Sequence, residues 1–263
     1  MIYGLYLSAT GVLTNSYRQD VIANNIANAE TVGFKRDLAL FQERLTEAQD
    51  RRFRGGTTGM PDGQTNDDLE PLGGGLFVSP TKIDTKQGEF ESTNNALDVA
   101  IQGDDGYFMV KDHDGNPRLT RAGSFMVDRE GHLILAHSGQ QGLDEKRKPI
   151  VLDGKLAGQT EVGRDGEITQ AGFPAAKIGL FSVPDSSQLT KRNGMLLDHP
   201  NVQTLAPAKG AQLYSGTVER SNVEPTTELA LLMDAQRQLE ANANMIKYQD
   251  ATLGKLVNEV GKI

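Results

Sequence analysis

The side chains that could do chemistry in this chain are few and scattered. The chain has no cysteine and four histidines, His113, His132, His137 and His199. None of these histidines forms the HExxH pattern or an HxH pair beside a carboxylate, which are spacings that hold zinc. His132 and His137 are five residues apart, which places them on opposite faces of a strand. We therefore expect no metal site.

Other motifs that could form a site also lack the required residues. Residues 112–116 read DHDGN, like the start of a calcium loop, but Gly123 stands at the twelfth position, where a glutamate is required. The pair Asp114-Gly115 predicts a tight hairpin turn instead. The glycines at 73–75 lack the strand–loop–helix context of a phosphate-binding loop, and no serine stands in a GxSxG elbow. We expect no catalytic residue, no cofactor and no enzyme activity.

The composition limits the possible partners. The chain has 263 residues, a net charge of −8, and only 37% hydrophobic and 6% aromatic residues, with no tryptophan. Duplex nucleic acid requires a basic face, which so acidic a chain does not offer. We interpret the run Arg51, Arg52 and Arg54 as a solvated loop. A core this modest also predicts that contacts between subunits supply part of the stability.

The N-terminus is apolar but does not read as a targeting signal. No lysine or arginine precedes Arg18, and no clear small-residue cleavage site follows the apolar stretch. The stretch is also too short, and too rich in Ser, Thr, Asn and Gly, to span a bilayer. We expect no cleaved signal peptide and no membrane insertion, so any export must use another route.

Both ends of the chain carry the apolar spacing of a helix that needs a partner. Near the C-terminus the spacing alternates between three and four residues at Leu229, Leu232, Gln236, Leu239, Ala243, Ile246, Asp250, Leu253, Val257 and Val260. The N-terminal stretch repeats the pattern at Ile2, Leu5, Ala9, Val12, Ser16, Gln19, Ala23 and Ile26. A mean spacing of about 3.5 residues is typical of a coiled-coil seam, which a single helix cannot bury. The pattern predicts two terminal helices that pair as a coiled coil.

The middle of the chain switches to strands and turns. Residues 49–75 contain seven glycines and two prolines, so they cannot bury enough surface to fold alone and are expected to form a loop or arm. From 76 to 214, short β-rich runs are separated by turn pairs such as Asp114-Gly115 and Asp165-Gly166. Such turns between short strands predict an antiparallel β domain.

The predicted fold is mixed and mainly β, with a central antiparallel β domain flanked by the terminal helices. The expected domains are an N-terminal helix and arm at 1–48, the Gly-rich loop or arm at 49–75, the β domain at 76–214 and the C-terminal helix at 215–263. Within the first of these, residues 35–48 are expected to form a short helix or an extended arm.

Three asparagines stand close together at the end of the first helix. Asn24, Asn25 and Asn28 are poor helix formers, so their density needs a reason. They could mark a fraying last turn that Gly33 ends. Alternatively, their amides could hydrogen-bond a partner helix across a tightly packed interface.

Three stretches, read together, resemble the bacterial flagellar rod and hook proteins. The first carries the family's ANN-x-AN-x-x-T-x-GFK motif at residues 23–35. The second carries DVAI-x-G-x-G-x-F-x-V at 98–110, with an extra Asp at 104–105 where we expect a local bulge. It continues into a YTR-x-G-x-F motif in which Leu119 replaces the usual aromatic residue. The third carries G-x-x-E-x-SNV-x-P at 216–225 and AQR-x-x-EAN at 235–242. The matches run in order along the whole chain.

The resemblance implies a structural axial subunit of the flagellar rod, which polymerises helically into the hollow drive shaft and transmits torque from motor to hook. It implies four kinds of partner: copies of the chain, other rod proteins, the hook protein and the flagellar type III export apparatus. It also implies export without cleavage to the periplasmic rod of the basal body. The length suits a proximal or distal rod protein. A hook or hook–rod junction protein of the same family is one alternative, and a carbohydrate-binding β domain is another.

The helical seams and the family motifs together predict an assembly interface. Its expected members are Ile2, Leu5, Ala9, Val12, Ala23, Asn24, Asn25, Ile26, Asn28, Gly33, Phe34, Leu229, Leu232, Gln236, Leu239, Asn242, Ala243, Ile246, Leu253 and Val257.

Overall fold

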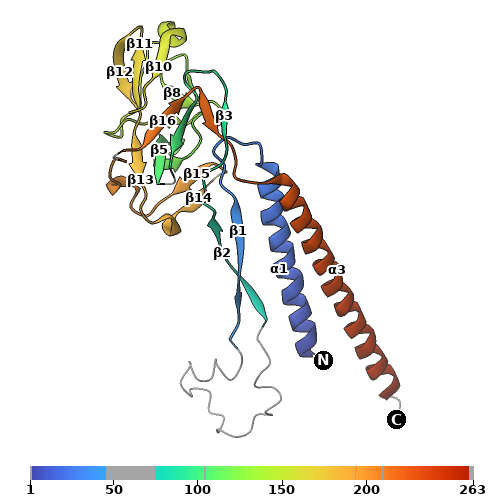
Figure 1. Ribbon diagram of the computed structural model, residues 1–263. Helices are drawn as coiled ribbons and strands as arrows, with labels where there is room; N and C mark the ends of the chain where they lie inside the picture. The colour runs from blue at the N-terminus through green and yellow to red at the C-terminus, as the bar shows by residue number, and fades with distance from the viewer. Residues whose placement is uncertain (1, 46–74, 104, 193, 209, 261–263) are drawn as a thin grey trace, which may run out of the picture. The chain divides into compact units, whose positions relative to one another are not determined.

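The chain forms two compact units, each assembled from segments far apart in the sequence. The computed structural model describes residues 2–45, 75–103, 105–192, 194–208 and 210–260 (Figure 1). The helical unit consists of Met1–Asn24, Leu38–Thr81 and Thr226–Ile263. The β unit consists of Asn25–Asp37 and Lys82–Pro225. Residues 25–37 and 215–225, which were expected to belong with the helices, thus belong to the β unit.

The helical unit contains the two long helices, which pack together in opposite directions. Helix α1 spans Ile2–Ala27, and α3 spans Pro225–Lys255 and continues as a π-helix over Leu256–Val260. A Cβ on Gly4 would lie 2.8 Å from Gln249 Nε2, and a Cβ on Gly11 would lie 2.7 Å from Asn242 Nδ2. Moving seven residues forward along α1 moves the contact seven residues back along α3, so the helices are antiparallel. The glycines let the two helices approach closely because they carry no side chain.

The helix contact differs from the predicted seam at alternate positions. The α3 side chains that are not exposed are Glu228, Leu231, Leu232, Ala235, Leu239, Asn242, Ala243, Ile246, Gln249 and Leu253. The predicted positions Leu229, Gln236, Asp250 and Val257 are exposed instead, and on α1 Ser16 and Ala23 are exposed. The spacing of three and four is retained, but Ala235 and Gln249 take the places expected for Gln236 and Asp250, each one residue earlier, and Asn242 is partly buried beside the predicted Ala243. Asn242 and Gln249 occupy the space opposite the α1 glycines.

A two-stranded ribbon contacts α1 within the same unit. Strand β1 spans Asp37–Glu43 and pairs with β2, which spans Leu76–Ile83. The Arg44 guanidinium donates a hydrogen bond to the Tyr6 hydroxyl, and a Cβ on Gly75 would lie 2.9 Å from Thr10 Oγ1. Of the two forms expected for 35–48, the extended one is correct for β1. The predicted arm lies outside the described residues except for Gly75, which begins the second described segment.

The β unit is built from short strands, and every pair among its described strands is antiparallel, as expected. The largest sheet has the order β14-β15-β6-β5-β9-β8-β7, and β13 also pairs with β5. Its strands are β5 Gly106–Lys111, β6 Pro117–Thr120, β7 Phe125–Val127, β8 Leu133–Leu135, β9 Gln141–Gly142, β13 Leu180–Ser182, β14 Thr190–Arg192 and β15 Leu196–Asp198.

Three smaller sheets complete the unit. Their pairings are β10-β11-β12, β16-β4 and β17-β3. The strands are β3 Phe90–Ser92, β4 Val99–Gln102, β10 Thr160–Val162, β11 Glu167–Gln170, β12 Phe173–Lys177, β16 Gln212–Ser215 and β17 Thr217–Glu219. The turn predicted at Asp114-Gly115 is confirmed: it joins β5 to β6, and Gly115 has a φ of +82°.

The core of the β unit lies on both faces of β5. Tyr107 and Met109 belong to one buried apolar cluster, whereas Phe108 and Val110 belong to another, as the alternation of a strand requires. Phe108 packs edge-on against Phe125 with ring centroids 5.3 Å apart. Each such fully buried side chain contributes roughly 1.5–3 kcal/mol of folding free energy. None of the helices within the described ranges is long and apolar enough to cross a membrane.

Candidate functional site: a buried charge cluster

The most deeply buried charged groups of the β unit meet in one cluster. Lys35 Nζ lies 2.6 Å from Glu219 Oε1, and neither side chain is more than 1% exposed. Arg121, whose side chain is fully buried, donates from Nη1 to Glu219 Oε2 at 3.4 Å. The backbone N–H of Gly88 donates to Glu219 Oε1 at 3.0 Å. Two cations therefore share one carboxylate in the interior.

Backbone carbonyls and an aromatic ring also contact the two cations, although Nε and Nη2 of Arg121 make no hydrogen bond with any described residue. Lys35 Nζ donates to Lys86 O at 2.6 Å. Arg121 Nη1 donates to Gly103 O at 2.8 Å, and its guanidinium carbon lies 4.6 Å from the centroid of the Tyr107 ring. Removing one partner from such a buried set is expensive because it leaves an uncompensated charge. The cluster therefore fixes its segments firmly relative to one another.

Two glycines allow the backbone to approach closely enough for these contacts. Gly33 has a φ of +68°, and its N–H donates to Glu219 O at 2.7 Å. A Cβ on Gly33 would lie only 2.3 Å from Ala122 N, and a Cβ on Gly123 would lie 1.7 Å from Val99 O. Both distances are shorter than non-bonded atoms tolerate. The sequence places glycine here because any side chain would push the segments apart.

Two amide side chains join the same segments by hydrogen bonds to the backbone. Asn222 Oδ1 accepts the N–H of Arg36 at 2.7 Å, and Asn222 Nδ2 donates to the carbonyls of Asp84 at 2.9 Å and Lys86 at 3.1 Å. Asn25 makes a two-point contact with the backbone of Asp37, accepting its N–H and donating to its carbonyl, each at 2.9 Å. A side-chain amide can donate and accept at once, which suits asparagine to this role.

A second lysine attaches the strand β14 to the same region. Lys191 Nζ donates to Lys35 O at 2.6 Å and to Asp37 Oδ2 at 2.9 Å. It also lies 3.6 Å from the centroid of the Phe34 ring, which is fully buried. Burial lowers the pKa of Lys191, although its hydrogen bond and charge interaction with Asp37 act in the opposite direction.

The cluster holds segments together and does not present reactive groups. Its amine, guanidinium and carboxylate are all buried, whereas a general acid or base must reach a substrate. The segments that meet are residues 33–36, 84–88, 121–123 and 219–222. They include the stretches by which the chain enters the β unit after α1 and leaves it before α3. The cluster therefore has a structural role, which is to hold these four segments together.

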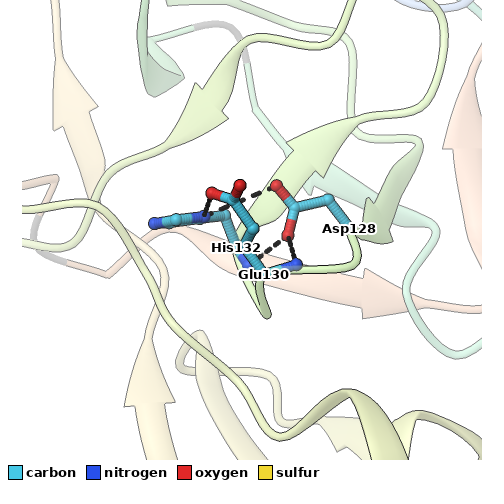
Figure 2. Close-up of side chains that lie close together, drawn as sticks. All are labelled: Asp128, Glu130 and His132. Carbon is cyan, nitrogen blue, oxygen red and sulfur yellow. Dashed lines mark hydrogen bonds and ion pairs between the residues drawn. The ribbon is translucent and has the colours of Figure 1, made fainter.

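A separate group of ionisable side chains lies between β7 and β8 (Figure 2). Asp128, Glu130 and His132 each offer a potential ligand atom, and these atoms lie within 4.8 Å of one another. His132 Nδ1 is 3.4 Å from Asp128 Oδ2 and 3.7 Å from Glu130 Oε2. The three residues stand at alternate positions around a turn and so match none of the common zinc-binding spacings in the sequence.

The geometry of this group is accounted for by the turn itself. Asp128 Oδ1 accepts the backbone N–H groups of Glu130 and His132, each at 2.8 Å, and Gly131 has a φ of +90°. Although desolvation raises the pKa of Asp128, these hydrogen bonds and the neighbouring His132 lower it overall. Aspartate commonly stabilises turns in this way. We assign no metal to these residues.

The predicted interface residues are divided between the two units. Phe34, Gly33 and Asn25 are buried within the β unit, where they contact residues of their own chain. Thr31 donates to Asn28 Oδ1 at 3.3 Å. On α3 the predicted residues Leu232, Leu239, Asn242, Ala243, Ile246 and Leu253 are partly buried, whereas Leu229, Gln236 and Val257 are exposed.

The remaining predicted residues lie on α1. Leu5, Ala9, Val12 and Ile26 are partly buried, and Ala23 and Asn24 are exposed. The backbone of Ile2 is helical, but its side chain lies outside the described set. Asp104, where a bulge was expected, is likewise outside the described residues.

Lys35, Arg121 and Glu219 were not among the site residues predicted from the sequence. A signal was present, since each is a charged residue within a glycine-rich or apolar motif: GFK, TRAG and GTVE. Charged residues among residues that will be buried are rare unless they are paired.

Three segments of the chain match families of known proteins. Residues 5–35 match the family described as "Flagella basal body rod protein", and residues 214–259 match "Flagellar basal body rod FlgEFG protein C-terminal". Residues 100–170 match "Flagellar hook protein FlgE/F/G D1 domain".

Full-length relatives extend the match to nearly the whole chain. The chain is 31% identical to the flagellar basal-body rod protein FlgF of Caulobacter vibrioides, over 98% of each protein. It is 33% identical to FlgG of Buchnera aphidicola, over 97% of this chain and 99% of the relative. It is also 33% identical to FlgG of Bacillus subtilis, over 98% of this chain and 99% of the relative. The chain belongs to the flagellar basal-body rod protein family.

The buried cluster joins the three segments by which this rod protein matches its family. Lys35 lies in the N-terminal match, Arg121 in the central match and Glu219 in the C-terminal match. The matched segments are thus physically connected through one carboxylate.

Proposed function

We propose that the chain is an axial subunit of the flagellar rod that polymerises helically into the hollow shaft transmitting torque from motor to hook. Family membership and one structural observation support this. Thirteen of the seventeen exposed large hydrophobic side chains among the described residues belong to the helical unit, and four belong to the β unit. Apolar surface of this extent on one part of a molecule is typical of protein–protein interfaces. Copies of the same chain are the partner that a rod subunit requires.

In the rod, the terminal helices form a coiled-coil layer. Their contact already repeats every seven residues, through Gly4 with Gln249 and Gly11 with Asn242. Exposed apolar residues of α3, such as Leu229 and Val257, are then available to neighbouring subunits. Close-packed helices have low compressibility, so such a layer resists twisting.

The β unit adds a rigid body to each subunit. The cluster of Lys35, Glu219 and Arg121 joins the segments through which the chain enters and leaves this unit. These buried ion pairs therefore hold the entering and leaving segments in fixed positions within the β unit when torque acts on the subunit. Contacts between different surfaces of successive copies build an open helical polymer, because they do not close into a ring.

The proposed location is the periplasmic rod of the basal body, reached through the flagellar type III export apparatus without a cleaved signal. Other rod proteins and the hook protein are the proposed neighbours. Relatives named FlgF and FlgG are similarly close, so both proximal and distal positions agree with the comparison. A hook or hook–rod junction protein is the alternative within the family. The length of this chain favours a rod protein, since the match covers 98–99% of the length of relatives named rod proteins.

A double substitution in the helix contact tests this function. Leu239 and Ile246 are partly buried on α3, and Leu239→Asp with Ile246→Asp places two carboxylates in the contact. Each unpaired buried charge costs several kcal/mol, so we expect loss of motility and of the chain from purified basal bodies. The matched control is Asn244→Asp with Lys247→Asp, at exposed positions of the same helix. Normal motility and normal rods in the Leu239/Ile246 variant would contradict the proposal.

A further inference from the structure

Residues 212–223, the last stretch of the β unit before α3, make most of their contacts with segments from much earlier in the chain. Strand β16 pairs with β4, so that Leu213 stands opposite Ile101, and β17 pairs with β3. Within the described part of the chain, β3 and β4 have no other strand partner. The backbone N–H of Thr93 also donates to Gly216 O at 2.8 Å. Two early strands are therefore completed only by the end of the unit.

The same stretch holds the residues that follow α1. Glu219 pairs with Lys35 through its carboxylate, and its backbone carbonyl accepts the N–H of Gly33 at 2.7 Å. Asn222 accepts the N–H of Arg36 at 2.7 Å. Lys35 and Glu219 are 184 residues apart in the sequence, and Arg36 and Asn222 are 186 apart. None of these contacts can form before nearly the whole β unit is available.

The central part of the unit also depends on this stretch. Arg121 directly follows β6, its side chain is fully buried, and the carboxylate that pairs with it belongs to Glu219. Leu213 lies in the same buried apolar cluster as Phe108, and its N–H donates to Arg164 O at 2.9 Å. A buried charge without its partner is strongly destabilising. The central strands therefore contain an uncompensated guanidinium until the end of the unit is added.

We propose that residues 212–223 are a closing segment, without which the earlier segments of the β unit do not reach their folded arrangement. A chain is synthesised from its N-terminus, so the closing segment becomes available after every other part of this unit. The inference concerns the folding of a single chain and goes beyond the proposed function. In a chain exported as proposed, it keeps the β unit unfolded until its last part is free.

The alternative is a central part that folds first and by itself. Strands β5 and β6 are neighbours in the sequence and pair with each other, with Phe108 opposite Thr120. Such local pairings form readily because they close only a short loop. Arg121 argues against a stable central part, since its buried guanidinium obtains its carboxylate only from the closing segment. The two alternatives differ in whether β5 and β6 become stably paired before β16 and β17.

A full chain with a specific protease site inserted after Gly210 tests the proposal. Gly210 is exposed, with no atom within 4 Å of the point where a Cβ would stand, so we expect the uncleaved variant to melt like the wild type. After cleavage, the fragments are separated in denaturant. Fragment 1–210 should show no cooperative melting in buffer, and a synthetic peptide of residues 211–225 should restore it. Cooperative melting of fragment 1–210 alone, or no restoration by the peptide, would overturn the proposal.

Two matched peptides test the part played by the buried charges. The Glu219→Gln peptide leaves Lys35 and Arg121 without their carboxylate, so it should bind fragment 1–210 at least about 100-fold more weakly than the natural peptide. The Arg220→Gln peptide removes only an exposed ion pair with Glu91, so its affinity should fall by no more than about five-fold. Equal affinities of the two peptides would overturn the part that the proposal gives to the buried charges.

Refolding of the unmodified chain gives a second measurement that needs no insertion. Pulsed hydrogen exchange compares the backbone N–H groups of β5 and β6 with those of β16 and β17, including the N–H of Leu213. We expect both sets to become protected in the same kinetic phase. Protection of β5 and β6 in an earlier phase would overturn the proposal. Neither measurement uses assembled rods, so absence of the chain from basal bodies would contradict the proposed function alone.

Discussion

Lys35 and Glu219, which are 184 residues apart in the sequence, form a buried ion pair with 2.6 Å between Nζ and Oε1. The pair ties the segment that follows α1 to the segment that precedes α3. A buried ion pair is not by itself strongly stabilising, because desolvation offsets much of the attraction. It does make the arrangement specific, because any other packing of these segments would leave a charge without its partner.

Glu219→Gln tests that specificity. The substitution removes the one carboxylate shared by Lys35 and Arg121, and loss of one partner from a buried pair costs about 3–5 kcal/mol. We expect the free energy of unfolding of the β unit to fall by that amount in denaturant titrations. Glu91→Gln, which removes an exposed ion pair with Arg220, should cost at most about 1 kcal/mol. Equal effects of the two substitutions would contradict the structural role of the cluster.

Comparing Gly33→Ala with Gly194→Ala distinguishes the cost of a steric collision from the cost of a left-handed backbone conformation. Gly33 has a φ of +68° and no room for a Cβ, whereas Gly194 has a φ of +70° and no atom within 4 Å of the point where a Cβ would stand. Both alanine variants incur the left-handed backbone penalty of about 1–2 kcal/mol. We expect Gly33→Ala to lower the melting temperature well beyond Gly194→Ala, since only the former collides with the backbone of Ala122. Similar melting temperatures would show that the β unit can relax around this position.

The lowered pKa of Lys191 predicts a dependence of stability on alkaline pH. Below the folded-state pKa the lysine is protonated in both states, and its contribution is constant. Between that pKa and the usual 10.5 the unfolded chain binds more protons, so the free energy of unfolding rises with pH. In Lys191→Met this rise should disappear. Lys177 is a control of opposite sign, since its hydrogen bond to Glu145 raises its pKa. An unchanged slope in Lys191→Met would contradict the prediction.

The positions of close helix approach predict which α1 substitutions disturb assembly. Gly11→Ile places a branched side chain against Asn242 and should separate α1 from α3, with loss of rods but an unchanged β unit. Ser16→Ile, at an exposed position that the periodicity placed in the seam, should be tolerated. Electron microscopy of basal bodies and the melting of the purified chains measure both effects. If Ser16→Ile disturbed assembly more than Gly11→Ile, the helix contact predicted from the heptad spacing would be favoured over the one in the structure.

The close approach of Gly4 and Gly11 to α3 explains why periodicity placed only part of the helix contact. Leu232, Leu239, Ile246 and Leu253 were identified because apolar residues at that spacing line one side of a helix. Ala235 and Gln249 were not identified, and Asn242 was expected only from the family motif, because the place of Asn242 and Gln249 in the contact depends on glycines in a helix more than two hundred residues away in the sequence. Local spacing carries no information on where a distant helix leaves space.

The helical ends, the antiparallel β region and the family could be predicted from the sequence, because periodicity, Asp-Gly turns and ordered motifs are local features. The buried site shared by Lys35, Arg121 and Glu219, and the contact of Asn25 with the backbone of Asp37, could not. These contacts are set by how strands and turns bring remote segments together. A charge is stabilised in the interior only by partners at bonding distance, and that distance exists only in the folded chain.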